Sequence, residues 1–179
     1  MWGLRRLLVG VLVAAAVLVG APAGAGPATT PDAGERALML GRLSIPAIGV
    51  NAGIIPTGVT RGGHLALGHS VRDVYRWRAG VQPGQKGSAV LAGHTWSQGH
   101  GVFDDLGRLR PGNIVVVGRN RFRVTRVRRI TGMTRSAVAG LFSDRGEPRL
   151  VLITCGDRND LTGVYRTRIV VNARLLPSR

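Results

Sequence analysis

Short runs in which apolar and polar residues alternate, or in which apolar residues follow one another, recur along this chain and are typical of β-strands. The alternation is clearest over residues 122–127, whereas residues 88–94 and 114–117 are almost continuously apolar. Turn-forming Gly and Pro residues separate these runs. We expect extended segments at residues 41–46, 48–55, 64–67, 75–77, 88–94, 114–117, 122–127, 150–155 and 165–171.

Helix signals are weak by comparison. Residues 102–107 have room for about one helical turn, and residues 136–142 predict a short helix. The sequence has no long amphipathic helix, no internal repeat and no phosphate-binding glycine pattern. If seven or eight of these extended segments are strands, then together with one or two short helices they predict a mainly β domain, either a barrel or a sandwich.

The chain begins with a basic segment followed by an apolar run. Two arginines precede an uncharged, mostly apolar stretch that ends near Ala28. This pattern is typical of a secretory signal or a signal anchor, and residues 23–25 (Ala-Gly-Ala) suit signal cleavage. We favour an anchor over residues 1–25, because the apolar run approaches the ~20 residues that span a bilayer. A flexible linker at residues 26–38 and a folded domain at residues 39–179 are expected to follow.

Composition narrows the classes of function. The chain has 25 basic and 9 acidic residues, a net charge of +16, and a single cysteine. One cysteine excludes an internal disulfide and a multi-cysteine metal site. The arginines are scattered and aromatic residues are few, which argues against nucleic acid as a partner. The charge is either a general surface property or a sign of an anionic neighbour, such as lipid or an acidic polymer.

The last two predicted strands place the only cysteine opposite arginine residues. Cys155 ends the run 150–155, and residues 156–163, rich in Gly, Asp and Asn, predict a turn or loop. On the return strand Arg166 and Arg168 fall on one face, so one of them can point at the thiol. Nearby cations favour the reactive thiolate. From this pattern alone, Cys155 is either a nucleophile or an inert, buried thiol.

A nucleophilic cysteine needs a base or a cationic partner within reach, and the chain offers four histidines. His94 is the best candidate, because it ends an apolar strand much as Cys155 does. His100 lies in a Gly-flanked loop, and His64 and His69 lie in a glycine-rich connection. No His-x-x-x-His pattern occurs, so we expect no metal site.

Four segments, in order, resemble the sortases, the cell-wall cysteine transpeptidases of Gram-positive bacteria. Residues 42–50 (RLSIPAIGV) resemble the opening strand of that family, and residues 91–95 (LAGHT) resemble the segment of its histidine. Residues 152–155 (LITC) resemble the strand of its nucleophile, and Arg168 follows thirteen residues later, as the essential arginine of the family does. The similarity covers residues 41–175.

The resemblance implies a closed sortase-type β-barrel of seven to eight strands, with Cys155 as the nucleophile and His94 as its acid/base partner. It also implies that Arg168 binds substrate and stabilises the oxyanion, and that Thr154 helps to position the substrate. Arg166 is the alternative to Arg168 if the register of the return strand differs by two residues.

The activity that the resemblance implies is cleavage of a Leu-Pro-x-Thr-Gly-type sorting signal between Thr and Gly through a cysteine thioester. The acyl group then passes to an amine of a cell-wall precursor or a pilin, and no cofactor takes part. The expected partners are surface proteins that carry a sorting signal. With its basic N-terminal end in the cytoplasm, the enzyme is expected to be a single-pass membrane protein with an extracellular catalytic domain, or secreted if the signal is cleaved.

The arginine-rich composition and compact domain are most similar to the actinobacterial class F sortases, and the acid-poor chain shows no acidic cluster for calcium. Two other interpretations stay open. An exported peptidoglycan L,D-transpeptidase also uses Cys and His, but residues 150–154 lack the His and Ser-x-Gly that precede its cysteine. A non-enzymatic basic domain that binds anionic wall polymer explains the charge, but not the joint presence of Cys155, His94 and Arg168.

Overall fold

The computed structural model describes residues 41–61, 65–96, 99–132, 135–158 and 165–177. The predicted anchor (residues 1–25) and linker (residues 26–38) lie outside these ranges, and the described residues include no helix long and apolar enough to cross a bilayer. The strands and helices are β1 (Arg42–Ile45), η1 (Pro46–Ile48), β2 (Val50–Thr57), β3 (Val74–Trp77), β4 (Ser88–Gly93), η2 (Leu106–Arg108), β5 (Ile114–Val117), β6 (Asn120–Thr131), α2 (Arg135–Leu141), β7 (Arg149–Arg158) and β8 (Tyr165–Leu175).

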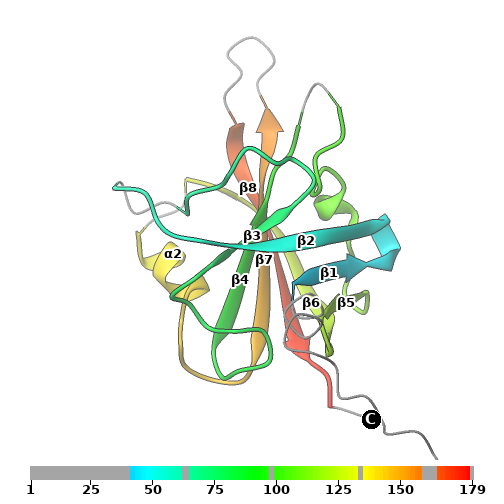
Figure 1. The fold of residues 1–179 in the computed structure, drawn as a ribbon, viewed down its shortest axis with the longest axis vertical. Coiled ribbons are helices and arrows are strands. Elements are labelled where there is room, and N and C mark those ends of the chain that lie inside the picture. Colours follow the sequence, from blue (N-terminus) through cyan, green and yellow to red (C-terminus); the bar gives the residue numbers. More distant parts are fainter. Residues whose placement is uncertain (1–40, 62–64, 97–98, 133–134, 159–164, 178–179) are drawn as a thin grey trace, which may run out of the picture. The chain divides into compact units, whose positions relative to one another are not determined.

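The eight strands form one closed barrel in the order β1-β2-β3-β4-β7-β8-β6-β5 (Figure 1). Most neighbours are antiparallel, but β2 pairs with β3, and β4 with β7, in parallel. The barrel confirms the mainly β prediction and decides between a barrel and a sandwich. The segment at residues 64–67 is an exception to the predicted strands, because Leu65 makes only an isolated bridge to Val59.

Proline and glycine end β1 where the sequence predicts. Pro46 begins the 3₁₀ turn η1, and Gly49 ends it with a left-handed φ of 65°, a conformation that favours glycine. Pro56, which we expected to follow the second strand, instead lies inside β2. Since β1 pairs with β2 only as far as Gly53, a residue without an N–H group is tolerated at this position.

β7 is longer than the sequence predicts. It continues past Cys155 and through Gly156 to Arg158, where we expected a turn or loop. A Cβ atom on Gly156 would lie 2.8 Å from Thr167 Oγ1 and 3.1 Å from Ile169 Cγ1. This glycine therefore serves close packing against β8 rather than chain reversal, and Cys155 lies within a strand rather than at its end.

Alternate residues of β7 and β8 point to opposite faces of the barrel wall. Leu152 and Val171 face the interior and belong to the main core. Val151 and Val170 face outward, where they form a second, smaller cluster with Leu141 of α2. The short helix therefore packs on the outer face of the wall, beside the strand that carries Cys155.

Leu152 is fully buried in the main core. Replacing it with alanine is expected to lower the free energy of unfolding by about 2–5 kcal/mol, because the change removes buried methyl groups and leaves a cavity. Denaturant unfolding followed by circular dichroism measures this loss. Val59→Ala, at an exposed position, is the control and should change the free energy by less than about 0.5 kcal/mol. Equal losses for the two variants would contradict the placement of Leu152 in the core.

Candidate active site

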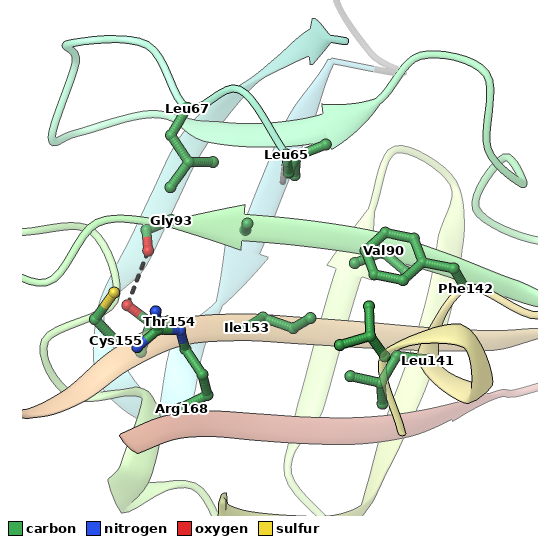
Figure 2. Close-up of a pocket in the computed structure, with 12 residues that line it drawn as sticks. Leu65, Leu67, Val90, Gly93, Leu141, Phe142, Ile153, Thr154, Cys155 and Arg168 are labelled. Carbon is green, nitrogen blue, oxygen red and sulfur yellow. Dashed lines mark hydrogen bonds between the residues drawn. The ribbon is translucent and has the colours of Figure 1, made fainter. Parts of the chain in front are cut away.

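Cys155 and Arg168 lie directly opposite one another on the antiparallel pair β7–β8. Directly paired residues carry their side chains on the same face, with Cβ atoms about 4.5–5.5 Å apart. Here that face is the outer one, and both side chains line the same groove (Figure 2). Arg168 Nη1 donates a hydrogen bond to the Thr167 carbonyl oxygen at 3.0 Å. The thiol and the guanidinium are thus neighbours, as the pattern of the return strand predicts.

His94 reaches the same end of the groove through the parallel pair β4–β7. The register pairs Ala92 with Ile153, and two further residues along each chain bring His94 level with Cys155. Neighbouring strands lie about 4.8 Å apart. The imidazole therefore comes from the residue that follows β4, on one side of β7, while the guanidinium comes from β8 on the other side.

Two threonine hydroxyl groups tie the end of β4 to β7 beside Cys155. Thr154 is buried, and its Oγ1 lies 2.8 Å from the Gly93 carbonyl oxygen. Thr95 Oγ1 lies 2.7 Å from the Cys155 carbonyl oxygen and 2.6 Å from Thr154 Oγ1. The two carbonyl oxygens can only accept hydrogen bonds. The two hydroxyl groups have one proton each, so at any moment only two of the three short contacts contain a donated proton. This network fixes the backbone on both sides of the thiol and the imidazole.

Thr95→Val removes one hydroxyl group of this network and nearly keeps the side-chain shape. The variant is expected to lose about 1–3 kcal/mol of stability, because Thr154 and the Cys155 carbonyl each lose a partner. It is also expected to slow the reaction of the Cys155 thiol roughly tenfold, since the groups around the thiol lose their alignment. Urea unfolding and the rate of reaction at the thiol measure the two effects. Thr125→Val, which removes an exposed hydroxyl that bonds the Asn172 carbonyl oxygen, is the control; equal effects in both variants would contradict a positioning role for Thr95.

The imidazole of His94 has two contacts from other parts of the barrel. Its Nε2 lies 2.8 Å from the carbonyl oxygen of Gly68, in the connection between β2 and β3. Since a carbonyl only accepts, Nε2 carries the proton in this arrangement. The ring of Tyr75 meets the imidazole edge-on, with centroids 6.0 Å apart and an interplanar angle of 79°. Together these contacts set the orientation of the ring.

The carboxylate of Asp104 shapes the loop that follows His94. Its Oδ1 accepts a hydrogen bond from the Trp96 N–H at 2.9 Å, and its Oδ2 accepts one from the Gly101 N–H at 2.8 Å. The Phe103 N–H donates to the His94 carbonyl oxygen at 3.1 Å. This loop is therefore bonded to His94 itself, which holds the backbone of the histidine in place.

An apolar groove of about 290 Å³ extends from Cys155 toward α2 (Figure 2). Strands β4 and β7 form its floor, α2 and the residue after it lie at its far end, and the connection between β2 and β3 covers another side. A groove of this kind suits an extended peptide with apolar side chains. Its lining consists of Leu65, Leu67, Val90, Ala92, Gly93, Val138, Leu141, Phe142, Ile153, Thr154, Cys155 and Arg168.

The structure brings together the four residues that the sequence proposes for the site. Cys155, Arg168 and Thr154 line the groove, and His94 lies level with Cys155. The side chain of Arg166 lies outside the described residues, as does His64, whereas His69 and His100 are exposed. Within the described ranges, no group of three or more His, Cys, Asp or Glu side chains is placed to hold a metal ion.

Sequence reasoning gave no role to Thr95, Gly68 or Asp104, although each contacts the site. The only sequence signal for Thr95 was its position directly after His94. The contacts of Gly68 and Asp104 depend on tertiary structure, and their local sequence carries no signal for them.

An eight-stranded barrel with a thiol and a guanidinium in one apolar groove, and an imidazole directly after the strand that neighbours the thiol, has the parts of a cysteine acyltransferase. A family profile described as Sortase domain matches residues 43–176. The chain therefore belongs to the sortase family and is a cysteine transpeptidase. This result excludes the wall-binding domain and the peptidoglycan L,D-transpeptidase as alternatives.

Solved sortase structures share this fold. Sortase C-1 from Actinomyces oris is 23% identical with a TM-score of 0.58, over 76% of this chain and 73% of its own. Sortase C-1 from Streptococcus pneumoniae is 20% identical with a TM-score of 0.60, over 78% of this chain and 67% of its own. Sortase A from Corynebacterium diphtheriae is 19% identical with a TM-score of 0.57, over 77% of this chain and 60% of its own. No curated protein matches the sequence significantly.

Proposed function

We propose that this sortase cleaves a Leu-Pro-x-Thr-Gly-type sorting signal between Thr and Gly and transfers the acyl part to an amine of a cell-wall precursor or a pilin. The observation that carries the proposal is the direct pairing of Cys155 with Arg168 at the end of an apolar groove. The apolar floor suits the Leu and Pro side chains of such a signal, and the polar end suits the carbonyl group that reacts.

The acylation step uses three side chains in turn. Cys155 passes its proton to His94, and the thiolate attacks the carbonyl carbon of Thr. The guanidinium of Arg168 stabilises the negative charge that forms on the carbonyl oxygen. His94 then gives its proton to the Gly nitrogen as the Thr–Gly bond breaks. The products are a thioester between Thr and Cys155, and a peptide that begins with Gly.

The transfer step runs through the same groups. An amine attacks the thioester carbon, His94 takes the proton of the amine, and the sulfur leaves Thr and regains a proton. Arg168 again faces the oxyanion, and water serves as a slow substitute for the amine. Thr154 acts as a positioning residue through its contact with the Gly93 carbonyl oxygen. Every proton and every bond in these two steps is accounted for by the substrates and these side chains, without a cofactor.

We also propose that residues 1–25 anchor the enzyme in the cell membrane and that residues 26–38 link the anchor to an extracellular catalytic domain. The basic end before an apolar run supports this orientation, and a secreted form would follow if the signal is cleaved. Membership of the actinobacterial class F is proposed on composition, since every basic residue except Lys86 is arginine.

Full-length protein in detergent, a quenched Leu-Pro-x-Thr-Gly peptide and triglycine test the proposed reaction. Mass spectrometry should detect an acyl-enzyme that carries the peptide up to Thr, and a product in which triglycine replaces the original Gly end. A Leu-Ala-x-Thr-Gly peptide is run in parallel. Folded protein that forms an acyl-enzyme from neither peptide would show that the proposed substrate class is wrong. Thioester hydrolysis without exchange would show that triglycine does not stand in for the acceptor.

A further inference from the structure

A second cavity lies on the outer face of the barrel, beside α2. Its volume is about 410 Å³, and Leu141 of α2 lies in the walls of both this cavity and the groove. Arg128 of β6 and Arg149 of β7 line it, together with Ser88 and Asn172. Among the described residues that line the cavity, none is acidic. The cavity is therefore basic and adjoins the end of the groove that lies away from Cys155.

The two arginines can donate hydrogen bonds to an anionic group. Arg128 Nε is buried and has no hydrogen-bond partner within the described part of the chain, which is costly for a polar atom unless a ligand or water pairs with it. Arg149 is held in place, because its Nε and Nη2 donate to Ser88 Oγ at 3.1 and 2.9 Å. Nη2 also donates to the Arg145 carbonyl oxygen at 3.2 Å. A carboxylate matches the fork of a guanidinium particularly well.

Distances along β7 place this cavity upstream of a peptide bound in the groove. Arg149 precedes Cys155 by six residues, which is about 20 Å along an extended strand. With its Thr at Cys155, an extended Leu-Pro-x-Thr segment carries its Leu about 10 Å along the groove. The remaining ~10 Å corresponds to roughly two to four residues on the N-terminal side of Leu.

We propose that the Arg128–Arg149 cavity is a subsite for an acidic side chain, Asp or Glu, that lies two to four residues before the sorting motif. This inference rests on the proposed function, since the peptide in the groove sets the direction in which the substrate chain leaves it. The carboxylate accepts hydrogen bonds from Arg128 Nε and from Arg149 Nη1, since Nε and Nη2 of Arg149 already donate to Ser88 and Arg145. The enzyme thereby selects among sorting signals by residues outside the motif itself.

Two quenched peptides that are identical from Leu onward test the subsite. One carries Asp or Glu at the second to fourth positions before Leu, and the other carries Asn or Gln there. Full-length wild-type protein is expected to cleave the acidic peptide with a kcat/KM about tenfold higher, and this preference should fall as the salt concentration rises. Arg128→Gln should bring the ratio of the two kcat/KM values close to one. Because the ratio is taken within one variant, a general loss of folded enzyme cancels.

Arg121→Gln is the matched control, because Arg121 is an exposed arginine of the same strand and lines neither cavity. It should keep the tenfold ratio, and an equal fall in Arg121→Gln would overturn the subsite in favour of net charge alone.

Fluorescence anisotropy with the same peptide pair and Cys155→Ala protein gives a second readout that does not need turnover. Tighter binding of the acidic peptide by about tenfold supports the subsite. This holds even if wild-type protein cleaves neither peptide, because that result would count only against the proposed cleavage. Equal dissociation constants for the two peptides overturn the subsite, and cleavage of both peptides by the wild type would then leave the proposed function standing.

Discussion

Replacing Cys155 with alanine is expected to abolish peptide cleavage and transfer, with a fall in kcat/KM of about 10⁴-fold or more. The physical reason is that the thioester needs a sulfur atom, and Cys155 is the only cysteine of the chain. Quenched-peptide cleavage measures the loss of rate. Mass spectrometry of the intact protein measures the loss of the acyl-enzyme, which forms only if the nucleophile is present.

The alanine variant should keep its fold, because Cys155 is only half-buried and has no disulfide partner. Thermal unfolding of wild type and variant therefore serves as the control, with closely similar midpoints expected. Cys155→Ser provides a second comparison, since a hydroxyl occupies nearly the same space but ionises far less readily than a thiol. An acyl adduct on Cys155→Ala would mean that a different side chain is the nucleophile.

Arg168→Gln is expected to lower kcat by about 10²–10³-fold with a smaller change in KM. In the proposed mechanism the guanidinium binds most strongly once the carbonyl oxygen becomes negative, so its loss is expected to weaken the transition state more than the bound substrate. Arg168→Lys should recover only part of the rate, because an ammonium group supplies charge without the planar fork. Steady-state kinetics with a quenched sorting peptide separate kcat from KM for each variant.

Arg166→Gln is the comparison for this experiment. Arg166 lies two residues before Arg168 in β8, while the observed register pairs Cys155 with Arg168. The Arg166 variant should therefore retain its rate within about threefold. A large loss in Arg166→Gln together with a small loss in Arg168→Gln would transfer the oxyanion role to Arg166.

Much of the barrel could be predicted from the sequence because strand patterns are local. The alternation in residues 122–127 and the apolar run before His94 both lie in strands of the structure. Pro56 and Gly156 were misleading, since each is usually found where a strand ends. Their neighbours in the barrel decide otherwise: β1 does not pair beside Pro56, and Thr167 and Ile169 fill the space above Gly156.

The candidate site was predictable in part for the same reason. Cys155 and Arg168 belong to consecutive strands, so an antiparallel pairing brings them together with no knowledge of the rest of the fold. The contact between His94 and the Gly68 carbonyl oxygen, by contrast, requires the parallel pairing of β2 with β3 and the path of their connection. The place of α2 on the outer face likewise follows from packing that no single segment encodes.

Folding of this enzyme and the appearance of its reactivity are coupled by the parallel pairing of β4 with β7. The residues joined there, Gly93 and Thr154, are 61 positions apart in the chain, and contacts between distant residues close large loops at an entropic cost and form slowly. In the proposed mechanism Cys155 acts together with His94, and the pairing of β4 with β7 brings their segments together. The return of acyl transfer after refolding is therefore expected to report when this long-range pairing forms.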